Sequence, residues 1–372
     1  MKISPFKLER YFDKYEFSAP YLLSSSDCEP MTLEELLNLD TSGISSEFGK
    51  TKLGYTESKG NPELREEISK LYTSVTPNDV LTLVPEEGIF ISMNVLLEKG
   101  DHVVATFPGY QSLYQVAIDI GCEVSKWEPD EDLNFRINDL QKLIRPNTKL
   151  LVINFPHNPT GSLLTRDELT QVVELASQNH ITIFSDEMYR FMEYDANNRL
   201  PSVSDLYDQS ISLFGLSKTF GLPGLRLGWL TTRNQYLMDR LITFKDYTTI
   251  CSNALSEKLG IIALQQKEVI IARSLSIIQT NLAEIESFAN RNAGWFKWRT
   301  PKAGSIAFPK LDISGSVMDF CQDLVNKKGV MLLPHNVYDF SRPHVRIGFG
   351  RKNLPEVLEV FSTYVKESAA IP

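Results

Sequence analysis

The sequence predicts an α/β fold, in which helices cover a mostly parallel sheet and a smaller α+β domain is attached. A chain of 372 residues, 42% of them hydrophobic, is long enough for about two domains with a buried core. Short runs of apolar and β-branched residues in the centre are typical of strands buried on both faces. A helix signal between two of these runs indicates the βαβ unit of a parallel sheet.

Four central runs are the expected strands of this sheet. After the second run, Thr165 and Glu168 form a capping box, and apolar residues from Leu169 to Ala176 recur at helical spacing. Ligands bind outside the carboxyl ends of the strands in such sheets, so polar residues directly after the strands are candidate site residues. The four runs are 102–107 (HVVATF), 150–155 (LLVINF), 181–184 (ITIF) and 211–216 (ISLFGL).

The carboxyl-terminal part predicts a smaller α+β domain. Residues 279–292 have the pattern of a helix, and the runs 306–311, 331–333 and 345–349 have that of short strands. We therefore expect an amino-terminal arm (1–45) that contributes to the small domain, a large cofactor-binding domain (46–280) and a small domain (281–372).

Composition argues against several classes of protein. The 38 basic and 47 acidic residues give a net charge of -9, which disfavours nucleic acid as a partner. The four cysteines are far apart and form no CxxC or Cys/His cluster, so no metal site is expected and a reducing, cytoplasmic setting is favoured. The amino terminus does not resemble a signal peptide, and no apolar run is long enough to cross a membrane.

The strongest candidate for catalytic chemistry is Lys218, in the segment SKTFGLPGLRLGW after the fourth strand. A lysine held there can condense with an aldehyde cofactor, while Ser217 and Arg226 can hold a phosphate group. Without other motifs, a lysine next to a serine is more often a surface residue than a cofactor-binding one. The assignment therefore depends on the other motifs.

Two further motifs, NFPHNPTG and SDEMYR, end the second and third strands. At these positions Asp186 can keep a pyridine nitrogen protonated. The Asn158 amide and the Tyr189 phenol can hydrogen-bond a hydroxyl on the same ring. Together these groups would make a pyridine ring a better electron sink.

These motifs, followed by VRIGFG, resemble in order the class I/II aminotransferases of pyridoxal 5'-phosphate (PLP) fold type I, over nearly the whole chain. The resemblance implies that PLP is the cofactor and that the substrate is an amino acid. It also implies that Lys218 holds PLP as a Schiff base and then acts as general base and acid. The remaining roles that it implies are a pyridinium partner (Asp186), ligands of the phenolic oxygen (Asn158, Tyr189), phosphate ligands (Ser217, Arg226) and substrate-carboxylate ligands (Arg346, with Asn158).

The resemblance extends to two tyrosines and to one unusual helix start. Tyr110, in FPGY, matches the aromatic residue that stacks on the cofactor ring. Tyr55 matches a tyrosine that reaches the phosphate of the neighbouring subunit, which implies a homodimer with shared active sites. In VPEEGI, the amides of Glu86 and Glu87 are expected to bind the phosphate, provided that both carboxylates point away.

The sequence leaves two reactions open. The segments LERYF, SSS, KDYTT and RIGF, with those above, resemble the capreomycidine-synthase branch of the family and the enduracididine-forming cyclase of guanitoxin biosynthesis. That resemblance favours elimination from a hydroxylated arginine and its cyclisation to a cyclic guanidino amino acid. Glu29 is the candidate for guanidinium recognition. The alternative is an aminotransferase that moves the amino group to a 2-oxo acid, and fold alone does not decide between them.

A non-catalytic role is a further alternative, because folds of this type also occur as regulatory domains fused to DNA-binding modules. Only residues 1–54 precede Tyr55, which leaves no room for a winged helix-turn-helix beyond the family's own arm. We therefore expect an enzyme.

Overall fold

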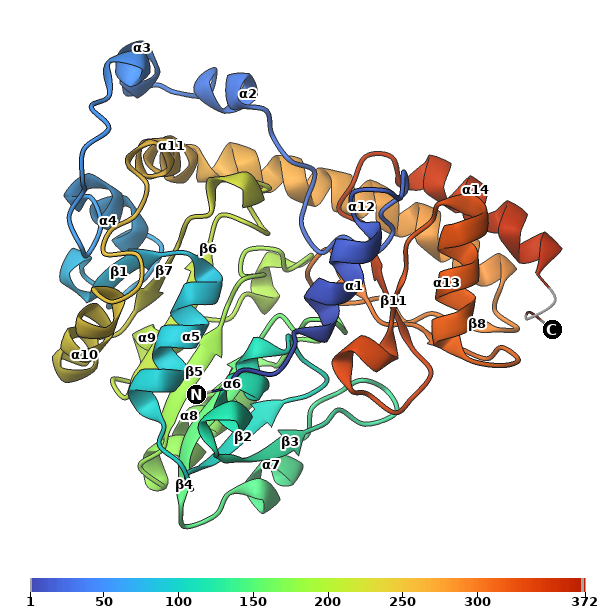
Figure 1. Ribbon diagram of the computed structural model, residues 1–372, viewed down its shortest axis with the longest axis horizontal. Helices are drawn as coiled ribbons and strands as arrows, with labels where there is room; N and C mark the ends of the chain where they lie inside the picture. Colours follow the sequence, from blue (N-terminus) through green and yellow to red (C-terminus); the bar gives the residue numbers. More distant parts are fainter. Residues whose placement is uncertain (1, 369–370, 372) are drawn as a thin grey trace.

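A computed structural model describes residues 2–368 and 371 of the chain. Its larger part is built around a seven-stranded sheet, and its smaller part contains two short sheets (Figure 1). The long helix α12 (Lys267–Arg291) extends from one part to the other. The domain boundary expected between residues 280 and 281 falls inside this helix.

The large sheet has the strand order β1-β7-β6-β5-β4-β2-β3. The strands β2 to β6 pair in parallel, whereas β7 is antiparallel to both of its neighbours, so the prediction of a mostly parallel sheet is confirmed. All four predicted runs form strands, as β2, β4, β5 and β6. The strands are β1 (Val80–Leu83), β2 (His102–Thr106), β3 (Glu123–Trp127), β4 (Thr148–Asn154), β5 (Thr182–Asp186), β6 (Ser210–Gly215) and β7 (Gly228–Thr231).

Apolar side chains cover both faces of this sheet, as the continuous apolar runs predict. In β2, Val103 and Ala105 belong to one core cluster and Val104 belongs to another. The helices α5 and α6 pack in the first cluster and α8 packs in the second. Thr165 caps α8 as predicted, because its hydroxyl accepts from the Glu168 amide.

Other helices complete the layers and the connections. The helices around the sheet are α4 (Pro62–Ser69), α5 (Pro85–Leu96), α6 (Ser112–Ile120), α7 (Ile137–Leu143), α8 (Arg166–Gln178), α9 (Val203–Leu206), α10 (Gln235–Lys245) and α11 (Ala254–Gln265). The amino-terminal helices are α1 (Lys7–Tyr15), α2 (Leu33–Leu37) and α3 (Ile44–Glu47). Figure 1 shows α1 between the two parts of the molecule. In the described part of the chain, no helix is long and apolar enough to cross a membrane.

The small part joins the carboxyl-terminal elements to the amino-terminal arm. Tyr21 forms a parallel bridge with Val330, and the Gly348 amide donates to the Leu23 carbonyl at 2.8 Å. These residues of the arm therefore pack against the small part. Its elements are β8 (Phe296–Lys297), β9 (Ile306–Ala307), β10 (Lys310–Leu311), α13 (Val317–Lys328), β11 (Leu333–Pro334), β12 (Val345–Gly348) and α14 (Leu354–Glu367).

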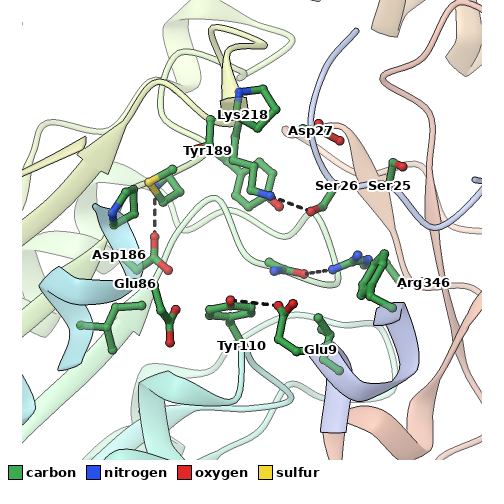
Figure 2. Close-up of a pocket in the computed structure, with 18 of the residues that line it drawn as sticks. Glu9, Ser25, Ser26, Asp27, Glu86, Tyr110, Asp186, Tyr189, Lys218 and Arg346 are labelled. Atoms are coloured by element: carbon green, nitrogen blue, oxygen red, sulfur yellow. Dashed lines mark hydrogen bonds between the residues drawn. The ribbon is translucent and has the colours of Figure 1, made fainter. Parts of the chain in front are cut away.

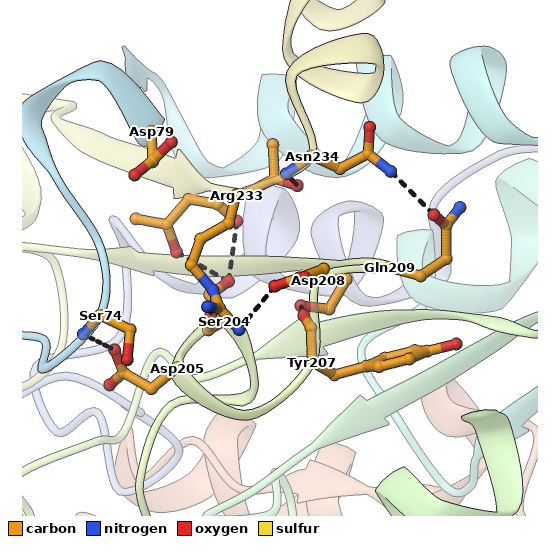
Figure 3. Close-up of polar contacts among 12 residues, drawn as sticks. Ser74, Asp79, Ser204, Asp205, Tyr207, Asp208, Gln209, Arg233 and Asn234 are labelled. Carbon is orange, nitrogen blue, oxygen red and sulfur yellow. Dashed lines mark hydrogen bonds and ion pairs between the residues drawn. The ribbon is translucent and has the colours of Figure 1, made fainter.

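The edge of the sheet where β6 begins is closed by a polar network (Figure 3). The Arg233 side chain donates to the Ser204 carbonyl at 2.8 Å and pairs with Asp208 at 2.7 Å. Asn234 donates to the Gln209 side chain at 2.8 Å. These groups pair with one another, so side chains stabilise this end of the sheet.

Candidate active site

A cavity of about 540 Å³ lies at the carboxyl ends of the parallel strands, between the sheet and the small part. Figure 2 shows Lys218, Asp186, Tyr110 and Arg346 arranged around it. Its wall includes nine residues that the sequence analysis selected. They are Glu86, Tyr110, Asn158, Asp186, Tyr189, Ser217, Lys218, Arg226 and Arg346.

Lys218 lies three residues after β6, which brings its side chain to the carboxyl edge of the sheet. Its Nζ donates to the Ser26 Oγ at 2.9 Å. Burial lowers the pKa of Lys218, although Asp27 and Asp186 oppose this shift. A lowered pKa increases the share of neutral amine, the form that attacks an aldehyde.

Asp186 is the last residue of β5 and faces the same cavity. Its carboxylate accepts from the Met188 amide at 3.1 Å. Burial raises the pKa of Asp186 to about 7, and the neighbouring Lys218 acts in the opposite direction. A buried carboxyl of this kind is stabilised by any cation placed next to it, including a protonated ring nitrogen.

The Tyr189 phenol is also buried in the cavity wall. Among the described residues its hydroxyl makes no hydrogen bond of normal geometry. Burial raises its pKa, although the nearby Ser26 side chain slightly opposes this rise. Since buried hydroxyls are normally paired, this group is suited to a ligand oxygen.

Arg346, in β12, lies at the opposite end of the cavity from Glu86 (Figure 2). Its Nη1 donates to the Tyr338 hydroxyl at 2.8 Å and to the Asn158 side-chain oxygen at 3.4 Å. Arg346 is 2% exposed, and these partners fix the plane of its guanidinium. The Nε and Nη2 edge of the guanidinium donates to the Ser24 carbonyl. The edge formed by Nη1 and Nη2 is therefore the one that could bind a carboxylate through two parallel hydrogen bonds, in exchange for the present Nη1 contacts.

The first turn of α5 lines another part of the cavity. Glu87 points away from the cavity, because its carboxylate accepts from the hydroxyls of Thr248 and Thr249. Glu86 does not, since its carboxylate lines the cavity and accepts from the Ser112 hydroxyl at 3.2 Å. The expectation that both carboxylates point away is therefore wrong for Glu86. Burial raises the Glu86 pKa to about 7, which reduces the negative charge of this carboxyl at neutral pH.

Ser217 and Arg226 complete the lysine side of the cavity. Ser217 is buried, whereas Arg226 is exposed and has a left-handed backbone with φ of 50°. The Arg226 guanidinium donates to the Pro223 carbonyl at 3.2 Å. This leaves most of its five N–H donors for an anion.

Besides Glu87, two sequence candidates, Glu29 and Tyr55, do not line the cavity. Glu29 points away from it, because its carboxylate accepts from the Lys352 amide at 2.9 Å and borders a separate hollow with Arg351. Tyr55 is 91% exposed, on the extended segment before α4. Glu29 therefore does not contact a ligand in the cavity. Tyr55 is exposed and could contact a second subunit.

Three other carboxylates, from Glu9, Glu16 and Asp27, do line the cavity. Glu9 accepts from the Tyr110 hydroxyl at 3.3 Å. The Glu16 pKa is raised, first by burial and then by Glu9 and Asp27, as expected for like charges held close together. We call these three side chains the acidic wall.

The acidic wall was not predicted from the sequence, although one signal for it is present. Glu9, Phe12 and Glu16 follow one another at spacings of three and four residues, which brings them to one face of a helix. Asp27 lies two positions before the residue that was chosen instead. Its orientation follows from the backbone path of the arm, which local sequence does not encode.

These residues fit PLP on their chemistry. A nucleophilic lysine, a buried carboxyl and an unpaired phenol suit its aldehyde, ring nitrogen and phenolic oxygen, respectively. Helix amides and Arg226 suit its phosphate. The volume of the cavity leaves room for an amino acid beside the cofactor.

Comparison with known proteins agrees with this fit. The family model for aminotransferase class I and II matches residues 23–361, so the chain belongs to this family, whose cofactor is PLP. Capreomycidine synthase from Streptomyces vinaceus is 28% identical, over 92% of this chain and 88% of its own. An aspartate aminotransferase from Sulfolobus acidocaldarius is 29% identical, over 79% of this chain and 78% of its own. The crystal structure of a PLP-dependent aminotransferase from Streptococcus suis has a TM-score of 0.92 and 32% identity, with 99% of each chain covered.

Proposed function

We propose that this enzyme acts on an amino acid with a cationic side chain, and that it dehydrates and cyclises a hydroxylated arginine. The acidic wall is the observation that carries the proposal. Two unit charges 4 Å apart interact by about 4 kcal/mol at an effective dielectric constant of 20. The carboxylates of Glu9 and Glu16 therefore favour a guanidinium and oppose the side-chain carboxylate of aspartate, whereas Asp27 is already paired with Arg351 at 2.9 Å.

In this proposal the two ends of the substrate are bound by opposite charges. Arg346 holds the α-carboxylate through its planar fork, with Asn158 beside it. The guanidinium lies against Glu9 and Asp27. This arrangement directs Cα towards Lys218.

The remaining cofactor contacts follow the chemistry of the cavity. Asp186 pairs with the ring nitrogen, and Asn158 and Tyr189 hydrogen-bond the phenolic oxygen. Tyr110 stacks on the ring. Ser217, Arg226 and the amides of Glu86 and Glu87 hold the phosphate. When bound, PLP supplies an electron sink that stabilises negative charge at Cα.

Lys218 carries the proton transfers of the reaction. Its amine takes the Cα proton and releases it before it takes a Cβ proton. The bond from Cγ to oxygen breaks with its electron pair on the oxygen, which is protonated to water. A guanidino nitrogen then bonds to the unsaturated carbon and loses a proton. Reprotonation then gives a cyclic guanidino amino acid and one water, with no loss of the amino group. The 28% identity to capreomycidine synthase supports this reaction type.

A second candidate is transamination, in which Lys218 moves the proton from Cα to the cofactor and the amino group passes to a 2-oxo acid. Relatives named as aminotransferases support this candidate. The deciding experiment incubates the enzyme with each hydroxyarginine isomer, with and without 2-oxoglutarate, and analyses the products by mass spectrometry. Loss of one water without an acceptor supports the cyclase. Steady transfer of nitrogen to the acceptor rejects it.

We also propose that the enzyme is a cytoplasmic homodimer with shared active sites. Segment 56–58 is tied to segment 246–252 by hydrogen bonds from the Thr56 and Ser58 hydroxyls. The exposed rings of Tyr55 and Tyr247 flank these contacts in the sequence. A second subunit that covers them would receive Tyr55 near its own phosphate site.

A further inference from the structure

The Lys218 amine has a direct hydroxyl partner in the cavity. Lys218 Nζ donates to Ser26 Oγ at 2.9 Å, and both residues line the cavity wall (Figure 2). We propose that Ser26 is a further catalytic residue, which relays a proton from the Lys218 amine to the leaving hydroxyl of the substrate. This inference rests on the proposed function, because only a substrate with a leaving hydroxyl needs that proton.

The backbone of residues 23–29, here called the strap, is fixed on both sides of Ser26. The Gly348 amide donates to the Leu23 carbonyl and the Glu29 amide donates to the Gly350 carbonyl, each at 2.8 Å. The Ser305 hydroxyl donates to the Ser26 carbonyl itself at 2.7 Å. The strap is thus held by residues of the small part, so Ser26 has a defined position.

Two glycines bring the strap this close. A Cβ atom at Gly348 would overlap the Ser25 carbonyl oxygen, and one at Gly350 would lie 2.6 Å from the Asp27 carbonyl oxygen. Only glycine permits both approaches without a shift of the backbone. The Ser26 backbone is held between these two contacts, and the hydrogen bond from Lys218 orients its hydroxyl.

A hydroxyl suits a relay between these groups because it accepts and donates at the same time. An ionised carboxylate such as those of the acidic wall only accepts. Ser26 precedes Asp27 in the cavity wall, and in the proposed function Asp27 contacts the guanidinium. In the proposed function the substrate side chain extends from Cα near Lys218 towards Asp27, so its leaving group passes the neighbouring Ser26 hydroxyl, which is bound to Lys218.

The proposed step balances in protons and electrons. The Lys218 amine takes the Cβ proton, and the C–H electron pair forms the new carbon–carbon double bond. The bond from Cγ to oxygen breaks, and its electron pair leaves with the oxygen. Ser26 gives its own proton to that oxygen and recovers one from the Lys218 ammonium. Water is released, Lys218 and Ser26 return to their starting states, and no oxidant or reductant is needed.

The test separates two reactions that both need Lys218. Plain arginine has no leaving group, so its Cα proton exchanges with deuterium oxide without the relay. The hydroxylated arginine needs the relay to form the dehydrated product. We expect Ser26→Ala to slow dehydration about 100-fold, the size of a lost general acid. We expect Cα exchange with arginine to change little.

Two variants serve as controls. Ser26→Thr keeps a hydroxyl and is expected to restore dehydration. Ser24→Ala removes a strap hydroxyl that is buried and does not line the cavity. Its ratio of dehydration to exchange is expected to equal that of the unaltered enzyme, even if a looser strap slows both reactions.

The possible outcomes are distinguishable. An equal loss of both rates in Ser26→Ala, or no loss of either, overturns the relay while the proposed function stands. If the unaltered enzyme dehydrates no hydroxyarginine isomer, the proposed function is wrong and the relay with it.

A measurement on the cofactor-free chain tests the contact itself. The Ser26 oxygen accepts from the Lys218 ammonium, so its removal should lower the Lys218 pKa further. The pH dependence of Lys218 acetylation, followed by mass spectrometry of its peptide, reports this pKa. An equal pKa in Ser26→Ala and the unaltered chain would mean that the hydrogen bond is absent in solution, which overturns the assignment.

Discussion

The guanidinium of Arg346 is bound to the backbone carbonyl of Ser24, through Nη2 at 2.7 Å and Nε at 3.2 Å. One side chain thereby joins β12 to the strap, while its Nη1 faces Tyr338 and Asn158. The orientation of the proposed carboxylate ligand thus depends on a segment more than three hundred residues away in sequence.

Arg346→Lys should weaken substrate binding while leaving PLP in place. Lysine keeps the charge but loses the planar fork, and a charged hydrogen bond contributes about 1.5–3 kcal/mol. We expect KM for the amino acid to rise about 10- to 100-fold. Steady-state kinetics and a PLP titration measure the two effects. An amine analogue without the carboxylate is the control, and an equal loss of its affinity would contradict the assignment.

Lys218 should be the residue that holds the cofactor. Reduction with borohydride, digestion and mass spectrometry are expected to find the pyridoxyl group on Lys218. Lys245 is a matched internal control, because it is also buried with a lowered pKa but donates to the Ser58 and Ile250 carbonyls outside the cavity. Lys218→Ala should lose the visible absorbance of lysine-bound PLP. A visible band that persists unchanged in this variant would reject the assignment.

Glu9→Gln should raise KM for hydroxyarginine about tenfold, because a charge-assisted hydrogen bond becomes a neutral one. KM for the uncharged citrulline analogue should stay unchanged. Glu29→Gln is the matched control, since Glu29 lies outside the cavity. If Glu29→Gln raises KM for the cationic substrate and Glu9→Gln does not, the sequence-based choice of Glu29 is right and the acidic wall is not the recognition site.

The stability of the cofactor-free chain should depend on the ionisation of Asp186. Its folded pKa of about 7 lies above the ordinary value of 3.8, so its contribution is fully present below pH 4 and is lost as pH rises towards 7. The loss is on the order of 4 kcal/mol. Asp186→Asn cannot titrate, so its free energy of unfolding should vary less between pH 5 and 8. Denaturant titrations at several pH values measure the difference, and parallel curves would contradict the shift.

Leu53→Asp should separate the proposed dimer, because Leu53 is exposed near Tyr55 and a buried charge without a partner is costly. Analytical ultracentrifugation should give a molecular mass of twice 42.2 kDa for the unaltered chain and a smaller mass for the variant. The affinity for PLP should also fall in this variant, because Tyr55 then no longer reaches the phosphate site of a second subunit. Val269→Asp, at an exposed position on α12, is the control. A monomeric unaltered chain with full PLP affinity would reject shared sites.

The sequence by itself determined the fold class and predicted which residues meet in the cavity. Continuous apolar runs require strands buried on both faces, and the ends of those strands lie at one edge of a parallel sheet. Asp186, Asn158 and Lys218 follow or end such strands, so their meeting in one cavity was predictable from local pattern alone.

Only the tertiary structure decided which acidic residues line the cavity. Glu29 and Asp27 are two positions apart in an irregular arm, where no periodicity gives the direction of a side chain. Their orientations are set by contacts with distant residues, including the Lys352 amide for Glu29 and the Arg351 side chain for Asp27. Ser26 acquired its contact with Lys218 in the same way. Helical and strand periods are local, whereas the path of the strap results from packing against glycines more than three hundred residues later.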